Sequence, residues 1–323
     1  MLRTRFCELL GIEHPIVSAP MGGTANGELA AAVSEAGGLG MIGGTSPGGP
    51  EWLRAQIRVA RERTTRPFGV GFITSFPDTG ELVRVALEER VTVVAHSFAD
   101  AAPYVGASHE AGARVVVQVQ TVEQAVRAVR AGADAVVAQG SEAGGHTGYA
   151  GTLSLLAAVL DAVAGTPVLA AGGIADGRGL AAVLVLGADG AWMGTRFVAS
   201  REWAGGNWAK QRLVEAGTDD TVQTHAYDQT MESPFPAGIG DRVLRNDFTA
   251  AWDGRDDEIV RRRGELQAQV FAAVKAGDPR VAPVRAGAAV GLIRAVEPAG
   301  DVVRRVVAEA EQVLRARPSQ VLR

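Results

Sequence analysis

The feature that most constrains the fold is a regular alternation of short apolar runs with amphipathic helical patterns. Helical patterns end at glycines, such as Gly37 and Gly112, immediately before the next apolar run. The junction reads Gly-Ala-Asp twice, at 132–134 and 187–189. A glycine ends a helix readily because it adopts a left-handed conformation at little cost. About eight such units within roughly 200 residues predict an α/β fold, a (β/α)8 TIM barrel, with a doubly wound open sheet as the second choice.

The apolar runs give the strands and the 3.6-residue periodicity gives the helices. The predicted strands cover 14–20, 39–42, 68–73, 91–95, 114–119, 135–138, 167–170 and 188–193. Helices are expected over 28–36, 52–63, 82–90, 121–132 and 153–163, and a further one ends near 111. The helix from Thr121 should begin with a capping box, because Gln124 follows three residues later.

The pattern changes after about residue 200. Residues 217–285 lack strand alternation and carry one clear helix, 257–276. We interpret this segment as a mostly helical lid inserted near the C-terminus. Residues 1–216 and 286–323 then form the barrel, with a last amphipathic helix at 301–316 packing back on it.

Charge and cysteine content narrow the range of possible ligands and partners. The formal net charge is -4 with dispersed Lys and Arg, which gives no basic stripe for nucleic acid. Cys7 is the single cysteine, so neither disulfides nor a multi-thiolate metal site is expected. No apolar run approaches the ~20 residues of a membrane span, and the N-terminus lacks a signal-peptide pattern. We expect a cytoplasmic protein.

His146 lies in the glycine-rich stretch 138–148, directly after the apolar run 135–138. Glycines allow backbone amides to approach a ligand closely. In a barrel of parallel strands, the chemistry sits at the carboxyl ends of the strands. We therefore expect a loop that holds His146 at the barrel mouth as a catalytic residue. The alternative is a surface loop with an incidental histidine.

Two further strand ends have the composition of phosphate sites. Glycine-rich segments follow the strands at 167–170 and 188–193, the usual phosphate-binding pair of such barrels. Backbone amides at Gly173, Gly194 and Thr195 could hold a phosphate dianion, and the Thr195 hydroxyl adds a donor. The alternative is that these glycines only make tight turns.

Other residues at the mouth suit a flat heteroaromatic ring. Met21-Gly22 follows the first strand, and Gln139 can both donate and accept hydrogen bonds at a ring edge. Gln118 is a weaker candidate, because an inward-facing polar residue can bond within the barrel. Cys7 follows no strand, so it is a poor nucleophile candidate.

Together these segments resemble the nitronate monooxygenases, formerly called 2-nitropropane dioxygenases. The resemblance covers about residues 1 to 250. The segments that carry it are Ala19-Pro20-Met21-Gly22, Gly37-Gly38-Leu39-Gly40, Gln139-Gly140-Ser141-Glu142-Ala143-Gly144-Gly145-His146, Ala171-Gly172-Gly173-Ile174 and Met193-Gly194-Thr195-Arg196-Phe197.

The resemblance implies an FMN-dependent barrel without a metal, with His146 as the active-site base. It implies oxidation of alkyl nitronates, and of nitroalkanes, by O₂ to a carbonyl compound and nitrite. The residues expected to hold FMN are Ala19, Pro20, Met21, Gly22, Gln118, Gln139, Gly144, Gly145, Gly172, Gly173, Met193, Gly194 and Thr195.

Several alternatives stay open at this stage. Gly71 stands where many relatives have Asn, which affects the substrate assignment. NAD(P)H-dependent reductases of quinones or enoyl thioesters share the histidine-loop pattern. A flavin-binding protein without turnover, or a barrel with another phosphate ligand, is the third hypothesis. Trp203 and Trp208 are expected to pack in the core or under the lid, or else to make a homodimer contact.

Overall fold

The computed structural model describes residues 2–322 and contains a barrel of eight parallel strands. The strands pair in the order β1-β9-β8-β6-β5-β4-β3-β2, and a parallel bridge between Val17 and Leu39 joins β1 to β2. The (β/α)8 prediction is thereby confirmed. The barrel strands are β1 (Ile16–Ser18), β2 (Gly40–Gly43), β3 (Phe68–Ile73), β4 (Val93–Ser97), β5 (Arg114–Val119), β6 (Ala135–Gln139), β8 (Val168–Ala171) and β9 (Gly190–Met193).

Alternate residues of each strand point into and out of the barrel. In β5, Val116 belongs to the interior cluster, whereas Val115 and Val117 pack outward against the helices. The interior is filled by branched and bulky side chains, and it is closed at the amino ends of the strands by α1 (Arg5–Leu10). Cys7 lies buried in α1, and this burial raises the pKa of its thiol. Both facts agree with the expectation that Cys7 is a poor nucleophile candidate.

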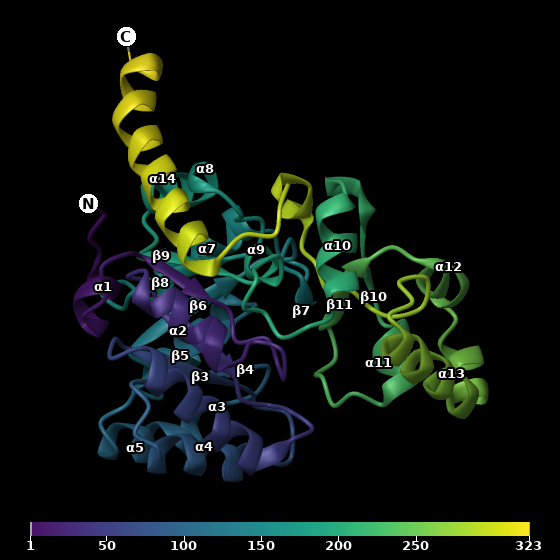
Figure 1. Cartoon of the computed structure of the whole chain (residues 1–323). Coiled ribbons are helices and arrows are strands. Elements are labelled where there is room, and N and C mark those ends of the chain that lie inside the picture. Colours follow the sequence, from purple (N-terminus) through teal and green to yellow (C-terminus); the bar gives the residue numbers. More distant parts are fainter. Residues whose placement is uncertain (1, 323) are drawn as a thin grey trace.

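A layer of helices surrounds the strands (Figure 1). The helices that follow the barrel strands are α2 (Gly27–Glu35), α3 (Gly49–Arg63), α4 (Thr79–Glu88), α5 (Ala102–Glu110), α6 (Val122–Arg130), α7 (Thr152–Ala162) and α8 (Gly177–Leu186). The last helix, α14 (Ala299–Val321), packs between α8 and α2. It therefore completes the outer layer, as the sequence predicted.

The segment after β9 contains more structure than its sequence pattern suggests. It holds α9 (Thr195–Val198), α10 (Asn207–Glu215), α11 (Ala226–Met231), α12 (Asp247–Trp252) and α13 (Asp256–Ala276), with short 3-10 turns at Thr218–Asp220 and Ala288–Leu292. In Figure 1, α11, α12 and α13 lie to one side of the barrel.

The expectation that 217–285 lacks strands is wrong. This segment contributes β10 (Thr221–Thr224) and β11 (Gly240–Leu244), which pair antiparallel. Strand β11 also pairs with β7 (Gly145–Thr147), so a small three-stranded sheet joins the lid to the loop after β6. The sequence pattern does not predict these strands, because each is short and β7 is distant in sequence from β11. The division of the chain into barrel and lid domains stays a prediction.

The two tryptophans after β9 pack within the chain. Trp203 contacts two of the buried clusters, and Trp208 lies against Gly277 at the end of α13. These contacts support the packing interpretation, and a homodimer remains a prediction. None of the helices within residues 2–322 is both long and apolar enough to cross a lipid bilayer.

The capping box that opens α6 gives a test of local stability. Thr121 accepts a hydrogen bond from the amide of Gln124, whose side chain accepts from the amide of Thr121. Replacing Thr121 by Ala removes the first of these bonds, and we expect a loss of about 1 kcal/mol of unfolding free energy. Thermal denaturation followed by circular dichroism would measure it. An unchanged midpoint would show that the cap contributes nothing.

Candidate active site

The loops at the carboxyl ends of the barrel strands contact one another. The amide of Ala19 donates to the carbonyl of Met193 at 2.9 Å, which joins the ends of β1 and β9. The amide of Gly140 donates to the carbonyl of Ala171 at 2.9 Å, which joins β6 and β8. Thr195 Oγ1 accepts from the amide of Gly287 at 2.9 Å. The predicted site residues at these strand ends are thus brought to one mouth.

His146 lies in a strand and not in a free loop, which corrects the sequence prediction. It is the central residue of β7 and stands opposite Asp241 of β11. Its side chain is only 9% exposed, which does not fit the alternative of an incidental histidine on a surface loop. The glycine-rich composition hides this strand, because glycine is normally depleted in strands.

A carboxylate and two aromatic rings surround the His146 imidazole. Nε2 lies 2.9 Å from Oδ1 and 3.1 Å from Oδ2 of Asp228, on α11. The Phe235 ring stacks on the imidazole with 3.4 Å between centroids and 9° between planes, and Phe98 approaches edge-on at 6.2 Å. The imidazole is therefore held at one edge by a carboxylate and on one face by an aromatic ring.

A second carboxylate nearby has its own partner. Asp241 is fully buried, and Arg285 contacts both of its oxygens, with Nη2 3.0 Å from Oδ2 and Nε 3.2 Å from Oδ1. This carboxylate raises the pKa of Arg285. Ligand atoms of His146, Asp228 and Asp241 lie within 4.8 Å of one another, a spacing that could hold a metal ion. Arg285 already supplies the positive charge beside Asp241, which favours an ion pair over a metal site.

Gln139 supports His146 through the backbone. Its Nε2 donates to the carbonyl of His146 at 3.1 Å, and its Oε1 accepts from Gln120 Nε2 at 2.9 Å. One N–H and one lone pair of the amide remain for a ligand. The sequence assigned Gln139 to the edge of a flat ring, and the structure adds this role in fixing β7.

The segments predicted to hold a cofactor phosphate have a fitting backbone. Gly172 and Gly173 both adopt positive φ, at 102° and 74°, which favours glycine. A Cβ at Gly172 would lie 2.8 Å from Thr152 Oγ1, whereas one at Gly173 or Gly194 would have no contact closer than 3.6 Å. Thr195 accepts from Gly287 and keeps its own O–H to donate. Gly172 therefore shapes the turn. Gly173 and Gly194 leave room for an anion, and the Thr195 hydroxyl can donate a hydrogen bond to it.

Two predicted residues are explained by packing within the chain. A Cβ at Gly144 would lie 2.5 Å from the backbone nitrogen of Gly287, so glycine is needed there for close chain contact. Gly145 adopts a φ of 75°, with Arg285 as its nearest neighbour. Gly144 and Gly145 thus place β7 against the segment around Arg285.

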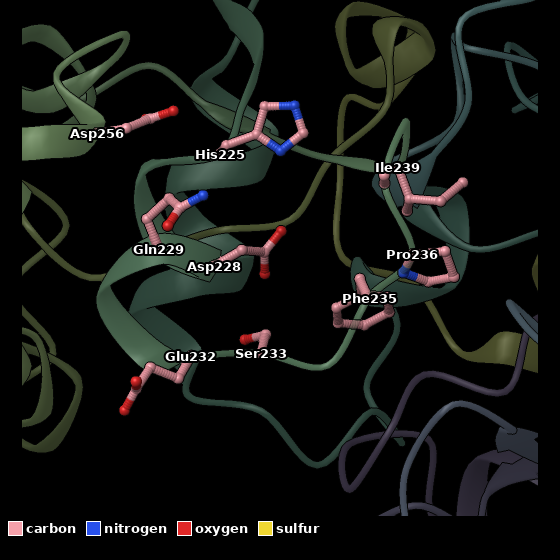
Figure 2. Close-up of a pocket in the computed structure, with 10 residues that line it drawn as sticks. His225, Asp228, Gln229, Glu232, Ser233, Phe235, Pro236, Ile239 and Asp256 are labelled. Atoms are coloured by element: carbon pink, nitrogen blue, oxygen red, sulfur yellow. The ribbon is translucent and has the colours of Figure 1, made fainter. Parts of the chain in front are cut away.

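Two cavities lie next to residues that contact His146. One of about 470 Å³ is lined by Asp228, Phe235 and Pro236, and Figure 2 shows the Asp228 carboxylate pointing from α11 toward Phe235. Another of about 370 Å³ is lined by Gln118, Gln120, Phe98 and Pro236. Gln118 therefore lines the same cavity as Phe98, which contacts His146, and Pro236 lines both cavities. The binding of a cofactor by Gln118 stays a prediction.

Five residues around His146 were missed from the sequence: Phe98, Asp228, Phe235, Asp241 and Arg285. Phe98 directly follows β4, and the other four lie in or next to the lid segment, about 80 to 140 positions after His146. The local sequence around Asp241 offered no strand signal, since Asp241-Arg242-Val243-Leu244 places two polar residues before two apolar ones and does not alternate.

Pro20 explains the glycine at position 71. A Cβ at Gly71 would lie 2.2 Å from Cγ and 2.6 Å from Cβ of Pro20. The pyrrolidine ring thus fills the space that a side chain at 71 would need. An Asn at this position fits only if Pro20 moves.

This contact predicts that Gly71→Ala overpacks the mouth. We expect a loss of about 1–3 kcal/mol of stability from the clash with Pro20. The double variant Gly71→Ala/Pro20→Ala should recover part of this loss, because it removes the ring. Chemical denaturation of the parent chain, Gly71→Ala, Pro20→Ala and the double variant would measure the coupling. Equal stability of Gly71→Ala and the parent chain would disprove the close contact.

Known proteins share this architecture along the whole chain. The sequence profile of the family described as nitronate monooxygenase matches residues 3–309. A nitronate monooxygenase of Pseudomonas aeruginosa is 35% identical, with 94% of this chain and 98% of that protein covered. The solved structure of FabK from Thermotoga maritima superposes with a TM-score of 0.90 at 38% identity, covering 99% of this chain and 100% of that one.

A relative with a different named activity is also similar. The (3aS,4S,5R,7aS)-5-hydroxy-7a-methyl-1-oxo-octahydro-1H-indene-4-carboxyl-CoA dehydrogenase of Mycobacterium tuberculosis is 41% identical over 249 residues, covering 76% of this chain and 67% of that protein. The family is generally flavin-dependent. The chain belongs to the nitronate monooxygenase family and is an oxidoreductase.

Proposed function

We propose that the chain uses FMN to oxidise alkyl nitronates, and nitroalkanes, with O₂ to a carbonyl compound and nitrite. The observation that carries this proposal is the position of His146. Its imidazole is nearly buried, contacts a carboxylate, and lies at the mouth where the glycine-rich strand ends meet. An imidazole can accept and release a proton and so suits removal of the acidic proton next to a nitro group.

The chain's own residues provide binding and shielding around the proposed cofactor. Bound FMN would supply a two-electron acceptor that returns its electrons to O₂. Gly173, Gly194 and the Thr195 hydroxyl would hold its phosphate, and Met21, Gly22 and Gln139 would lie along its ring. The other predicted binding residues are Ala19, Pro20, Gln118, Gly144, Gly145, Gly172 and Met193.

Two aromatic residues, Phe235 of the lid and Phe98 after β4, would protect the reacting atoms from water. Phe98 and Phe235 contact each other with 5.3 Å between centroids, and both contact His146. A dry surrounding would strengthen the attraction between the protonated imidazole and an anionic nitronate. For a neutral nitroalkane, the same imidazole would first accept the α-proton.

The second candidate is an oxidoreductase of acyl thioesters. The 41% identity with a carboxyl-CoA dehydrogenase favours it. Thioesters also have an acidic α-carbon, so the same histidine could move a proton there. The geometry at His146 therefore fits both substrate classes.

An anaerobic titration separates the two candidates. The flavin absorbance of the purified protein would be followed while propionate-3-nitronate, NADH or NADPH is added. A nitronate oxidase is bleached rapidly by the nitronate. Rapid bleaching by NADH or NADPH, with none by the nitronate, would support a reductase and overturn the first proposal.

Replacing His146 by Asn tests the base. We expect kcat/KM for nitroethane to fall by about 10²–10⁴, the usual contribution of a general base. Turnover of ethyl nitronate, which is already deprotonated, should fall much less. Steady-state oxygen consumption with both substrates measures the difference, and equal losses would remove His146 from this role.

A further inference from the structure

We propose that Asp228 is the positioning residue of the active site: it keeps the proton of His146 on Nε2 and so makes Nδ1 the atom that accepts the substrate proton. This inference rests on the proposed function for its kinetic consequences. Its structural part, the choice of tautomer, holds for any substrate.

The contact is short and protected from solvent. Both oxygens of Asp228 lie within hydrogen-bond distance of Nε2, at 2.9 and 3.1 Å. The two side chains are 9% and 11% exposed, so water competes little for this bond. Within residues 2–322, the Asp228 carboxylate has no other hydrogen-bond partner. The imidazole is therefore its one hydrogen-bonding partner in this part of the chain, while the charge of Arg285 also acts on it electrostatically.

The chemistry of the two groups fixes the tautomer. An ionised carboxylate only accepts hydrogen bonds, so Nε2 must be the donor and carries the ring proton. The lone pair of the neutral ring is then on Nδ1, which has no hydrogen-bond partner in the described chain. When the α-proton of a nitroalkane moves to Nδ1, the C–H electron pair stays on the substrate as the nitronate. The negative charge of Asp228 then stabilises the imidazolium that forms.

The other charged groups near His146 are already paired. Asp241, opposite His146 in the small sheet, is bound by Arg285. His225 hydrogen-bonds Tyr149 at 3.1 Å. Asp228 is thus the carboxylate that faces the imidazole.

One other histidine can be excluded from a pH profile near neutrality. His96 is buried in β4, and this burial lowers its pKa to about 4. It stays neutral at the pH values at which the enzyme would be assayed. A change of the reaction rate with pH near neutrality therefore does not report on His96.

The lid acquires a chemical role through this contact. Asp228 lies on α11, which packs against α13, whereas His146 extends from the loop after β6. The barrel supplies the base and the lid supplies the group that orients it. Proton transfer should therefore depend on the lid being seated on the barrel.

Substitution of Asp228 tests the kinetic consequence. In Asp228→Asn the amide can donate to Nε2, which allows the wrong tautomer, and kcat/KM for nitroethane should fall about 100-fold or more. The rate with ethyl nitronate should change by less than about threefold, since no proton is removed. Asp228→Glu should restore part of the nitroethane rate and the parent pH profile.

Glu265→Gln is the matched control. Glu265 is an exposed lid acid on α13 that pairs with Arg262 and does not contact His146. Glu265→Gln should leave the rates with nitroethane and with ethyl nitronate unchanged. Equal losses of nitroethane and nitronate turnover in Asp228→Asn, or no loss of either, would overturn the positioning role.

The tautomer itself can be measured without turnover. The chain has five histidines, so the ¹⁵N signals of His146 in flavin-loaded protein are assigned by their loss in His146→Asn. We expect a protonated Nε2 in the parent and a shift toward protonated Nδ1 in Asp228→Asn. An identical tautomer in both would reject the inference. If the parent oxidises neither substrate, the proposed function fails while this measurement still decides the role of Asp228.

Discussion

The site depends on the pairing of β7 with β11. Directly opposite residues of an antiparallel pair share one face of the sheet, and successive residues alternate between faces. His146 therefore points to the same side as Asp241, toward the lid, while Thr147 turns back and donates to the carbonyl of Gly140 at 2.9 Å. Arg242 reinforces the pairing, since its Nε donates to the carbonyl of Ser141 at 2.8 Å. A slip of one residue would turn His146 away from the lid.

The pairing also brings two carboxylates close to one imidazole, which is electrostatically costly unless each has a partner. A buried charge needs a counter-charge or hydrogen bonds that replace water. Asp241, the more buried of the two, is bound by the permanently charged Arg285. Asp228 hydrogen-bonds the imidazole of His146, and the charge of Arg285 also acts on it. The arrangement thus pairs one carboxylate with a guanidinium and the other with the imidazole.

The barrel could be predicted because its signals are local. Strands at 68–73 and 114–119 have the predicted bounds, and the capping box at Thr121 forms as expected. A buried parallel strand is a continuous apolar run, and a helix ending in glycine follows from backbone sterics. Both can be recognised within about ten residues.

The site could be predicted only where it follows from the barrel. Parallel strands put their carboxyl ends at one mouth, so His146 and the glycine-rich loops could be grouped from strand order alone. The lid contacts could not, since nothing near Asp228 indicates a partner 82 residues earlier. Strand β7 has three residues and begins with glycine, so pairing with β11 defines it more than its own composition does.

The stacking of Phe235 on His146 follows from the chain around it. Pro234 and Pro236 flank Phe235, and each proline fixes its own φ and restricts the residue before it. The segment therefore loses little entropy when it orders, which lowers the free-energy cost of holding an aromatic ring against the imidazole. With Asp228 at Nε2 and Phe235 on one face, Nδ1 and the opposite face remain for a substrate.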